Sequence, residues 1–383
     1  MKIAYVYDTI YPYTLGGVEK WIWQLSLRLA RLGHEVHIFG PKFWTGENVF
    51  NKEGVYLHGV CSPPKKRFVE GKRSIGWPIY FAVRVLPPLL KERFDIIDCQ
   101  NFPYFPCFSA KIASKVRKSK LIITWHEVWD SWWYSYLGRV KGFMGKTIEQ
   151  MCLRLSNCMI AISNRVKADL LAKDVEENRI AVVNVGTDWQ GIQGIRPATE
   201  KYEIIFVGRL VSYRNVDVLI RAVALLRRKL PEIQCAIVGD GPEKNALVTL
   251  SRELGIEQHI KFLGFLPKDE QVISYLKASK VFVLPSTLEG LPQVLLEANA
   301  CSLPVIIINH KNNAATAIVN DGENGFKVEL SEQAVSQKVW QVLTDDELRL
   351  NMSRKSIEFA RGRDWSQVAT KLEKTYLGFL KKD

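Results

Sequence analysis

The chain has 383 residues, 47% of them hydrophobic, and a formal net charge of +13 at pH 7. That length suits two domains with separate cores, and no apolar run reaches the roughly 18 residues needed to cross a bilayer. The 7 cysteines lack the spacing of a disulfide framework or a metal site, and early charges exclude a signal peptide. We therefore expect a cytoplasmic protein, either free or peripheral on the cytoplasmic face of a membrane.

The positive charge is concentrated in the first half. Residues 1–190 contain 27 Lys and Arg against 17 Asp and Glu, a net charge of +10, whereas the remainder has a net charge of +3. The basic residues cluster at 65–67, at 72–73 and at Lys111, Lys115, Arg117, Lys118 and Lys120. Such clusters suit an anionic membrane surface or a phosphorylated acceptor, although ordinary solvated loops and helix faces are an equal alternative. Nucleic acid is disfavoured as a partner, because the sequence contains no motif of that class.

Along the chain, short β-branched runs alternate with amphipathic stretches, a pattern typical of βαβ units around parallel sheets. In the first half, strands are expected at residues 3–7, 36–39, 95–99, 121–125 and 159–162. A helix is expected at 18–32, ending at Gly33, with a buried face made of Trp21, Ile22, Leu25, Leu29 and Leu32. Residues 62–76, with two prolines and many charges, predict a long loop.

The periodicity disappears at residues 189–200, which makes this stretch the best linker candidate. A second series follows, with strands expected at 203–207, 234–238, 260–262, 281–284 and 305–308, and helices at 215–230, 242–254, 268–278 and 292–300. Residues from 331 onward predict helix, and Leu372, Tyr376 and Leu380 are in phase in the last one. The sequence thus predicts an α/β protein of two doubly wound, Rossmann-like domains, 1–190 and 198–363, facing across a cleft. Ligands of such sheets bind at the carboxyl ends of the strands.

The most informative segment is 284–298, where two glutamates, Glu289 and Glu297, lie on either side of a strand-to-helix turn. Gly290 frees the turn, and Pro292 suits the first position of a helix. Glu289 is then in the loop at the positive end of the helix, and Glu297 is about a turn and a half inside. Such a pair can hold a polyhydroxylated ligand at two points while the helix N-terminus faces its phosphates.

This segment resembles the E-x7-E signature of the retaining glycosyltransferases of family 4. Further matches to that family occur at 16–19 (Gly-Gly-Val-Glu), 124–127 (Thr-Trp-His-Glu), 208–210 (Gly-Arg-Leu) with Arg214, 239–242 (Gly-Asp-Gly-Pro), 301–305 and 321–326. The resemblance implies the two-domain GT-B architecture, with the C-terminal helix, 364–383, crossing back to the first domain.

The resemblance also implies a nucleotide-diphosphate sugar as donor substrate, UDP- or GDP-linked, and no cofactor. Breaking its glycosidic bond leaves negative charge on the diphosphate, which fixed cations stabilise. Arg209 and Arg214 would supply those cations, and the amides of Gly16 and Gly17 would add neutral donors at a helix N-terminus. A surface salt bridge and a plain turn are the alternatives for Arg209 and for the glycines. We expect no metal, because the sequence has no Asp-x-Asp motif.

By the same resemblance, Glu297 would bind the ribose hydroxyls, Glu289 would face the sugar and its developing oxocarbenium charge, and His126 would contact the sugar or its phosphate. The remaining donor-binding residues implied by the family are Gly208, Gly241, Gly290, Leu291 and Pro292. Retaining members of the family are thought to use a donor phosphate oxygen as the base, so no protein base is nominated; Glu127 is the candidate if there is one. The other histidines are interpreted as structural or solvated.

An unusually dense aromatic group comprises Trp125, Trp129, Trp132, Trp133, Tyr134 and Tyr136. Trp129, Trp132 and Trp133, at i, i+3 and i+4, predict one helical face. Two explanations carry equal weight. The group packs in the core, or it forms an acceptor cleft that stacks on sugars or an interfacial patch.

The chain also departs from the family pattern. Where the family usually has Lys followed by Gly, this chain has Arg214 followed by Asn215. Ser302 stands in place of a usual Gly, and residues 184–188 stand in place of the turn Pro-Asn-Gly-Val-Asp. Residues 312–316 (Asn-Asn-Ala-Ala-Thr) lack an acid that the family has there. These changes affect the identity of the donor and leave the cations and the paired glutamates in place.

The sequence therefore predicts a retaining, metal-independent transferase that moves a hexose from a nucleotide-diphosphate sugar to a saccharide or lipid-linked acceptor in glycan or glycolipid synthesis. Two alternatives stay open. One is a nucleotide-sugar epimerase on the same architecture, and the other is a non-catalytic, donor-binding subunit of a glycan-assembly complex. A requirement for an acceptor separates the transferase from the epimerase.

Overall fold

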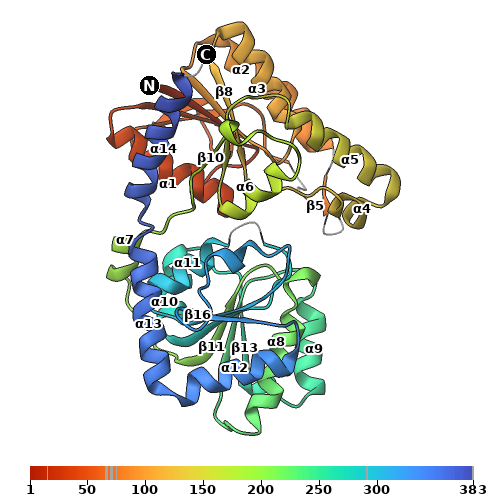
Figure 1. Cartoon of the computed structure of the whole chain (residues 1–383), viewed down its shortest axis with the longest axis vertical. Helices are drawn as coiled ribbons and strands as arrows, with labels where there is room; N and C mark the ends of the chain where they lie inside the picture. The colour runs from red at the N-terminus through yellow and green to blue at the C-terminus, as the bar shows by residue number, and fades with distance from the viewer. Residues whose placement is uncertain (15, 65–67, 70–71, 75, 290–291, 382–383) are drawn as a thin grey trace. The chain divides into compact units, whose positions relative to one another are not determined.

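The computed structural model describes residues 1–14, 16–64, 68–69, 72–74, 76–289 and 292–381. The chain divides into two compact units. Unit 1 comprises Met1–Val185 and Trp365–Asp383, and unit 2 comprises Gly186–Asp364. Each unit is a parallel sheet with helices packed around it, as the alternating pattern of the sequence predicts (Figure 1).

The sheet of unit 1 has 8 strands in the order β10-β9-β8-β7-β1-β2-β4-β3. Its strands are β1 (Lys2–Val6), β2 (Glu35–Gly40), β3 (Val49–Lys52), β4 (Val55–Gly59), β7 (Ile96–Gln100), β8 (Lys120–Trp125), β9 (Met159–Ala161) and β10 (Ile180–Val182). All neighbouring strands are parallel except β3 and β4, which form an antiparallel edge hairpin that the periodicity did not indicate. Its turn is made by Glu53 and Gly54, both at positive φ.

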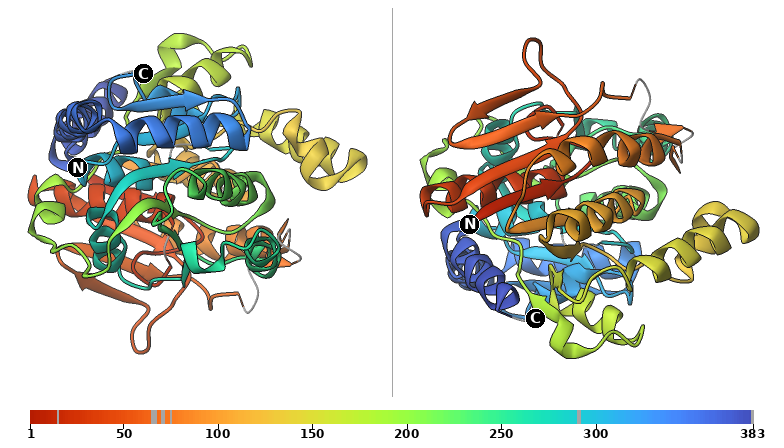
Figure 2. Two further views of the ribbon diagram at one scale, coloured as in Figure 1. Left: turned by 90° about the horizontal axis from the view of Figure 1, so that it is seen from below. Right: turned by 90° about the horizontal axis from the view of Figure 1, so that it is seen from above.

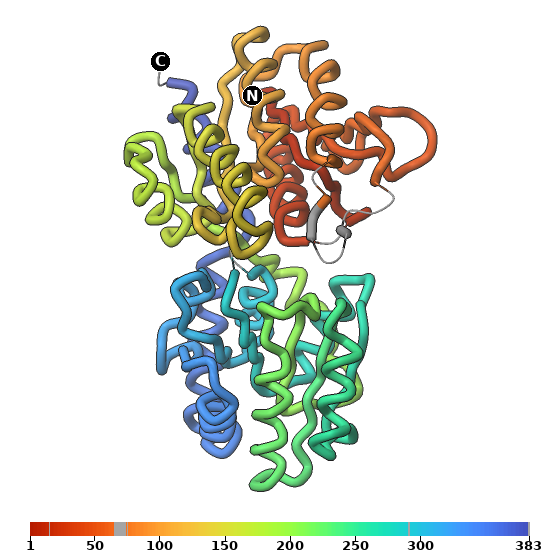
Figure 3. Tube along the Cα trace, turned by 90° about the vertical axis from the view of Figure 1, so that its right-hand side faces the viewer, coloured from red at the N-terminus to blue at the C-terminus, as the bar shows by residue number. Residues whose placement is uncertain are grey.

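The helices of unit 1 are α1 (Gly17–Arg31), α2 (Gly76–Lys91), α3 (Phe105–Arg117), α4 (Trp132–Leu137), α5 (Arg139–Cys152), α6 (Asn164–Leu171), α14 (Trp365–Leu380) and the short η1 (Glu177–Arg179). The expected buried face of α1 is confirmed except for Leu32, which lies past the helix and is 47% exposed. The expected loop at 62–76 contains a two-stranded hairpin, β5 (Phe68–Val69) with β6 (Lys72–Arg73). Helices α4 and α5 project from the body of unit 1 (Figures 1 and 2) and lie towards the viewer in Figure 3.

The C-terminal helix α14 belongs to unit 1 and packs against α1. Leu372 and Tyr376 are buried in this contact, whereas Leu380, expected in the same phase, is 36% exposed. His34, just after α1, is 2.7 Å from Glu373, and the Tyr376 hydroxyl is 3.1 Å from the Tyr5 hydroxyl on β1. The last helix therefore contributes to the core of a sheet whose first strand begins at Lys2.

The sheet of unit 2 has 6 parallel strands in the order β13-β12-β11-β14-β15-β16. Its strands are β11 (Tyr202–Val207), β12 (Cys235–Val238), β13 (Ile260–Gly264), β14 (Ser279–Leu284), β15 (Val305–Ile308) and β16 (Gly325–Val328). Its helices are α7 (Trp189–Gly194), α8 (Val216–Arg227), α9 (Lys244–Glu253), α10 (Asp269–Lys277), α11 (Gln293–Ala300), α12 (Glu332–Thr344) and α13 (Asp346–Arg361), with short turns η2 (Ser212–Arg214), η3 (Glu257–His259) and η4 (Ala314–Ala317). β11 and β14 are adjacent, so the loops after them leave the same edge of the sheet.

The stretch expected to be a linker, 189–200, begins with helix α7. Asp188 caps this helix, since its carboxylate accepts a hydrogen bond from the Gly191 amide. Thr187 donates from its amide to the Arg363 carbonyl at 2.9 Å, so the two chain segments that bound unit 2 pair with each other. The glycine-rich stretch that was expected to be a linker therefore begins with a capped helix. The boundary between the units lies a few residues earlier, between Val185 and Gly186.

Across the described residues, no helix has both the length and the apolar character that crossing a membrane requires. All of the cysteines are buried, and none of them forms a disulfide.

Candidate functional site

His126 lies directly after β8, at the carboxyl edge of the unit 1 sheet, and is 9% exposed. Its Nε2 is 2.7 Å from Oε1 of Gln100, the last residue of the neighbouring strand β7. Gln100 is oriented by Asp98, because its amide nitrogen donates to Asp98 Oδ1 at 3.0 Å. The Gln100 oxygen can only accept, so His126 Nε2 carries the proton and Nδ1 keeps its lone pair.

Asp98 is the centre of this network and is fully buried. Its Oδ1 also accepts from the Thr124 hydroxyl at 2.7 Å, and its Oδ2 accepts from the Tyr376 hydroxyl of α14 at 2.5 Å. Burial raises the pKa of Asp98 to about 6, and the hydrogen bonds from Tyr376, Thr124 and Gln100 oppose that rise. The C-terminal helix is thus connected to His126 through a buried carboxylate.

The backbone and charge of His126 are equally constrained. Asn101 accepts from the His126 amide at 3.0 Å and donates to the Glu127 carbonyl at 3.0 Å. Trp21 of α1 meets the His126 ring edge to face, with the ring centroids 5.8 Å apart. Burial lowers the pKa of His126 to about 3, so the ring is neutral at physiological pH. The structure therefore prepares His126 as a neutral hydrogen-bond acceptor of fixed tautomer.

The glycine loop leads into α1, which begins at Gly17 with Gly16 as its N-cap residue. A Cβ at Gly16 would lie 2.7 Å from the carboxylate of Glu19, whereas one at Gly17 would meet nothing within 4 Å. Glu19 is 4% exposed, so a buried acid of the first turn already lies beside the helix N-terminus. The sequence analysis included Glu19 in the 16–19 match but gave it no role, although an acid three residues after the N-cap is a known capping signal.

In unit 2, the loops after β11 and β14 bring Arg214 and Glu289 together. Arg214 Nη1 forms an ion pair with Glu289 Oε1 and lies 3.4 Å from the Ser286 hydroxyl. The side chains are 17% and 6% exposed, respectively, and Arg214 Nε is buried without a hydrogen-bond partner among the described atoms. Burial raises the pKa of Glu289, and the charge of Arg214 opposes that rise. A buried cation with an unused N–H group is a ready donor to an anionic ligand.

Asn313 holds the Glu289 loop in place. Its amide nitrogen donates to the Ser286 carbonyl at 3.0 Å and to the Ile308 carbonyl at 2.8 Å. The Glu289 backbone accepts from the Ala314 amide at 3.0 Å, next to it. Sequence reasoning recorded only the missing acid in 312–316 and overlooked this asparagine, whose position after a strand was the available signal.

Close backbone contacts with the loop after β11 explain why the loop after β12 has glycine at positions 239 and 241. A Cβ at Gly241 would lie 2.2 Å from the Leu210 carbonyl oxygen, and one at Gly239 would lie 1.9 Å from the Gly208 oxygen. The Leu210 amide donates to the Asp240 carbonyl at 3.0 Å, so the turn after β12 packs backbone to backbone against the loop after β11. This contact fixes the loop that carries Arg209, which is exposed.

The remaining predicted donor residues lie around α11. Pro292, expected at the first helical position, is the N-cap residue with ψ 112°, and the helix starts at Gln293. Glu297 is half-buried in the second turn of α11. Gly290 and Leu291 lie outside the described residues, as do Lys65, Lys66 and Arg67 of the basic clusters.

The aromatic group is only partly helical, because α4 starts at Trp132 and Trp129 precedes it. The expected common helical face is therefore wrong, yet the rings still gather, with Trp129 centroids 4.8 Å from Trp132 and 4.6 Å from Trp133. They surround Glu149, 1% exposed, which accepts from the Tyr104 hydroxyl at 2.6 Å and from the Trp129 amide at 2.9 Å. A buried acid fixes this aromatic cluster, a feature of core packing.

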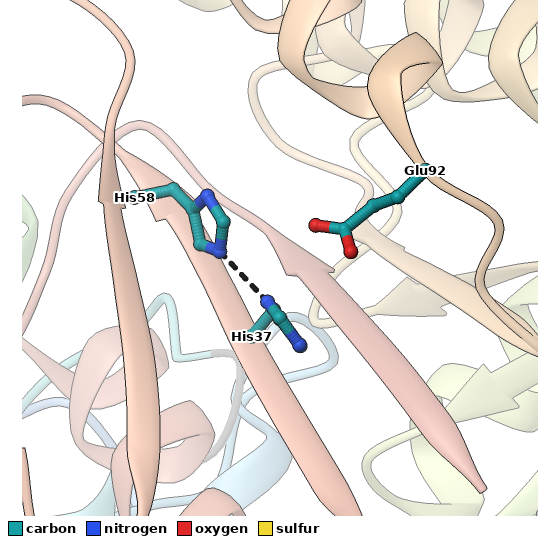
Figure 4. Close-up of side chains that lie close together, drawn as sticks. All are labelled: His37, His58 and Glu92. Carbon is teal, nitrogen blue, oxygen red and sulfur yellow. Dashed lines mark hydrogen bonds between the residues drawn. The ribbon is translucent and has the colours of Figure 1, made fainter. Parts of the chain in front are cut away.

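A second polar cluster joins the buried His37 of β2 and His58 of β4 to the half-buried Glu92, just after α2 (Figure 4), with one ligand atom of each within 4.8 Å of the others. His37 Nδ1 is 2.7 Å from His58 Nε2. Burial lowers the pKa of His58 to about 4. The Lys2 ammonium is 2.6 Å from Glu92 and 2.9 Å from Glu35, so ion pairs within the chain already offset these carboxylates. The interpretation of these histidines as structural or solvated stays a prediction.

The sequence and the fold are similar to those of known proteins. A family model described as "Glycosyltransferase Family 4" matches residues 15–190, and one described as "Glycosyl transferases group 1" matches residues 189–359. An uncharacterized glycosyltransferase of Haemophilus influenzae is 30% identical over 235 residues, which are 60% of this chain and 64% of the relative.

A second relative, from Campylobacter jejuni, is 34% identical over 176 residues, 46% of each chain, and is named N-acetylgalactosamine-N,N'-diacetylbacillosaminyl-diphospho-undecaprenol 4-alpha-N-acetylgalactosaminyltransferase. The matched segments thus span about half to two-thirds of the lengths of these relatives. The crystal structure of Anabaena HepE in complex with UDP-glucose superimposes with a TM-score of 0.77 at 18% identity, covering 99% of this chain and 100% of that one. This likeness shows that the chain, with its two units, has the two-domain GT-B fold.

Proposed function

This chain belongs to family 4 of the group 1 glycosyltransferases, and we propose that it transfers a hexose from a nucleotide-diphosphate sugar to a saccharide or lipid-linked acceptor, with retention of configuration. The observation that carries the proposal is the Arg214–Glu289 pair at the carboxyl ends of β11 and β14. The relative named for a diphospho-undecaprenol acceptor and the neighbour bound to UDP-glucose support a lipid-linked acceptor and a UDP-sugar donor.

In the proposed reaction, the bond between the anomeric carbon and the donor phosphate oxygen breaks, and its electron pair stays on the diphosphate. Arg214 and Arg209 stabilise that charge, and the Nε–H of Arg214, which has no hydrogen-bond partner among the described atoms, donates to such an anion in this scheme. The acceptor oxygen bonds to the same face of the anomeric carbon, and its proton goes to a phosphate oxygen of the departing diphosphate. Because the cations replace a metal ion in this scheme, EDTA should not affect the rate.

Glu289 has a distinct task in this scheme. It faces the sugar and stabilises the positive charge that develops on the ring, and the adjacent charge of Arg214 opposes the rise that burial causes in its pKa. His126, neutral and with its Nδ1 lone pair available, accepts a hydrogen bond from a sugar hydroxyl. The amides of Gly16 and Gly17, together with Gly208, Gly241, Gly290, Leu291, Pro292 and Glu297, bind the rest of the donor.

We also propose that unit 1 rests on the cytoplasmic face of an anionic membrane. Lys111, Lys115, Lys118, Lys120 and Arg179 line one surface hollow at the end of α3. Burial and the charge of Lys115 lower the pKa of Lys111, which is what crowded cations experience when no anion is bound. Anionic lipid headgroups would relieve this repulsion.

The proposal is tested by a thermal-shift screen of the whole chain against UDP-, GDP- and ADP-sugars, with and without EDTA, followed by a transfer assay. One nucleotide class should raise the melting temperature, and release of the free nucleoside diphosphate should require an acceptor. No shift with any nucleotide would overturn the donor site. Donor isomerisation without an acceptor would favour an epimerase, and loss of transfer in EDTA would contradict the metal-free scheme.

A further inference from the structure

Unit 1 contains an apolar cavity of about 190 Å3 between α2, the start of α3 and the projecting pair α4–α5. Its walls are almost entirely aromatic and aliphatic, and include Phe102, Phe105, Trp133, Tyr136, Leu137 and Ile148. An engineered cavity of ~150 Å3 with apolar walls stays dry and binds a benzene molecule. The cavity of unit 1 therefore has room for a short segment of a hydrocarbon chain.

The cavity opens onto exposed apolar surface. Ile79 and Met144 line it and are nevertheless 44% and 57% exposed. On the same helix α5, Val140 and Phe143 are also exposed, at 78% and 63%. Large hydrophobic side chains exposed on one helix indicate a surface that meets an apolar partner. Helix α5 projects from the body of unit 1 (Figure 2).

A positive charge lies at the same place. Lys141 of α5 is the one charged side chain among the described residues that line the cavity. The apolar walls and this ammonium group together match an amphiphile whose hydrocarbon chain is joined to an anionic group.

We propose that this cavity binds the first part of the isoprenoid chain of a polyprenyl phosphate, with the phosphate at Lys141. In such a lipid, one chain is attached directly to phosphate, so an apolar cavity and an adjacent cation receive both parts without a spacer. A phospholipid has two chains and a glycerol between chain and phosphate, which suits a cavity of this size less well. The inference rests on the proposed function in taking this lipid to be the carrier of the acceptor sugar.

The test is the affinity of the purified full chain for farnesyl phosphate, followed through the fluorescence of Trp133 and its neighbours, with inorganic phosphate as comparison. Ile148→Trp fills the cavity, Met144→Asp places a negative charge at its exposed mouth, and Lys141→Glu reverses the cation. Each change should weaken farnesyl phosphate binding by about tenfold or more, since each removes apolar burial or the ion pair. Met144 is exposed, so its variant keeps the experiment informative if Ile148→Trp fails to fold.

Arg139→Glu is the matched control, because it changes the net charge equally on the same helix but does not line the cavity. Arg214→Gln controls for occupation of the donor site by the phosphate. Both should bind farnesyl phosphate as the parent chain does. Equal binding by all variants, or farnesyl phosphate binding no tighter than inorganic phosphate, would overturn the proposal. Failure of the donor screen would instead overturn the proposed function, whatever the lipid result.

Discussion

The polar clusters of the two units differ in how completely the chain satisfies them. In unit 1, Asp98 accepts hydrogen bonds from three side chains, and His126 is held in one tautomer through Gln100. In unit 2, Arg214 pairs with Glu289 yet keeps a buried Nε–H without a partner. The first cluster leaves the neutral Nδ1 lone pair of His126 for a ligand, whereas the second leaves a cationic N–H donor. Under the proposed function, His126 of unit 1 would supply a neutral hydrogen-bond acceptor, and Arg214 of unit 2 would supply the charge that acts on the donor.

The largest expected effect is on the charged cluster. Glu289→Gln should lower turnover by about 10²–10³-fold while the circular dichroism spectrum is unchanged, because charge stabilisation in the transition state is lost. Transfer assays under saturating donor would measure it, with Glu329→Gln, an exposed acid of the same unit, as control. Near-normal turnover of Glu289→Gln would remove this residue from the mechanism.

The neutral cluster should respond more weakly. Asp98→Asn puts an amide where three donors converge, which frees Gln100 and His126 to turn, and we expect turnover to fall about tenfold. Tyr376→Phe leaves the Asp98–Gln100–His126 connection intact and should reduce the free energy of unfolding by about 1–3 kcal/mol with little change in turnover. The two variants thus separate positioning of His126 from stability of the fold. Equal losses of turnover would contradict that separation.

The pH dependence of stability provides a test on Asp98 itself. Its pKa is about 6 in the folded chain against 3.8 for an ordinary aspartate, so the folded state takes up a proton between pH 6 and pH 4 that the unfolded state does not. The cost of its ionisation is therefore present above pH 6 and disappears as the pH falls. Relative to Asp98→Asn, the parent should gain about 2 kcal/mol between pH 7 and pH 4. Urea titrations at a series of pH values measure this gain, and a constant difference would refute it.

The smallest expected effect concerns the loop that supports the charged cluster. Gly241→Ala places a methyl group against the Leu210 carbonyl, so the two loops must separate, at a cost of about 1–3 kcal/mol in unfolding free energy and with weaker donor binding. Gly194→Ala, where nothing lies within 4 Å of the new Cβ, should change stability by less than about 0.5 kcal/mol. Denaturant titration of both variants decides the point, and equal stabilities would show that the close contact is unimportant.

The local features of both units could be predicted from the sequence. The strands before Glu289 and His126, and the helix after Glu289, follow from apolar periodicity and from glycine and proline at the turn, so the loops of Glu289 and His126 were placed correctly at the strand ends. The antiparallel β3–β4 hairpin was missed, because its strands are short and lie at a sheet edge. Helix α2 was also missed; it contains Pro87 and Pro88, which ordinarily predict a helix end.

The tertiary partners of the site residues could not be predicted from the sequence. Asp98 is embedded in a strand that reads as apolar core, and its partner Tyr376 lies 278 residues away, a pairing that no local pattern encodes. Arg214 was predicted as a phosphate ligand from its loop, but its ion pair with Glu289 spans 75 residues and depends on β11 and β14 being neighbours in the sheet. Sequence patterns therefore predicted the residue types of the charged cluster and left the neutral network undetected.

The central claim is that the Arg214–Glu289 pair is built to receive the donor diphosphate. It is tested most directly by calorimetric titration of the parent chain and of Arg214→Gln with the nucleoside diphosphate whose sugar raises the melting temperature. We predict that the substitution weakens binding of the nucleoside diphosphate by about 100-fold, since a charge-assisted contact in a buried site is lost. Unchanged affinity in Arg214→Gln would contradict the account.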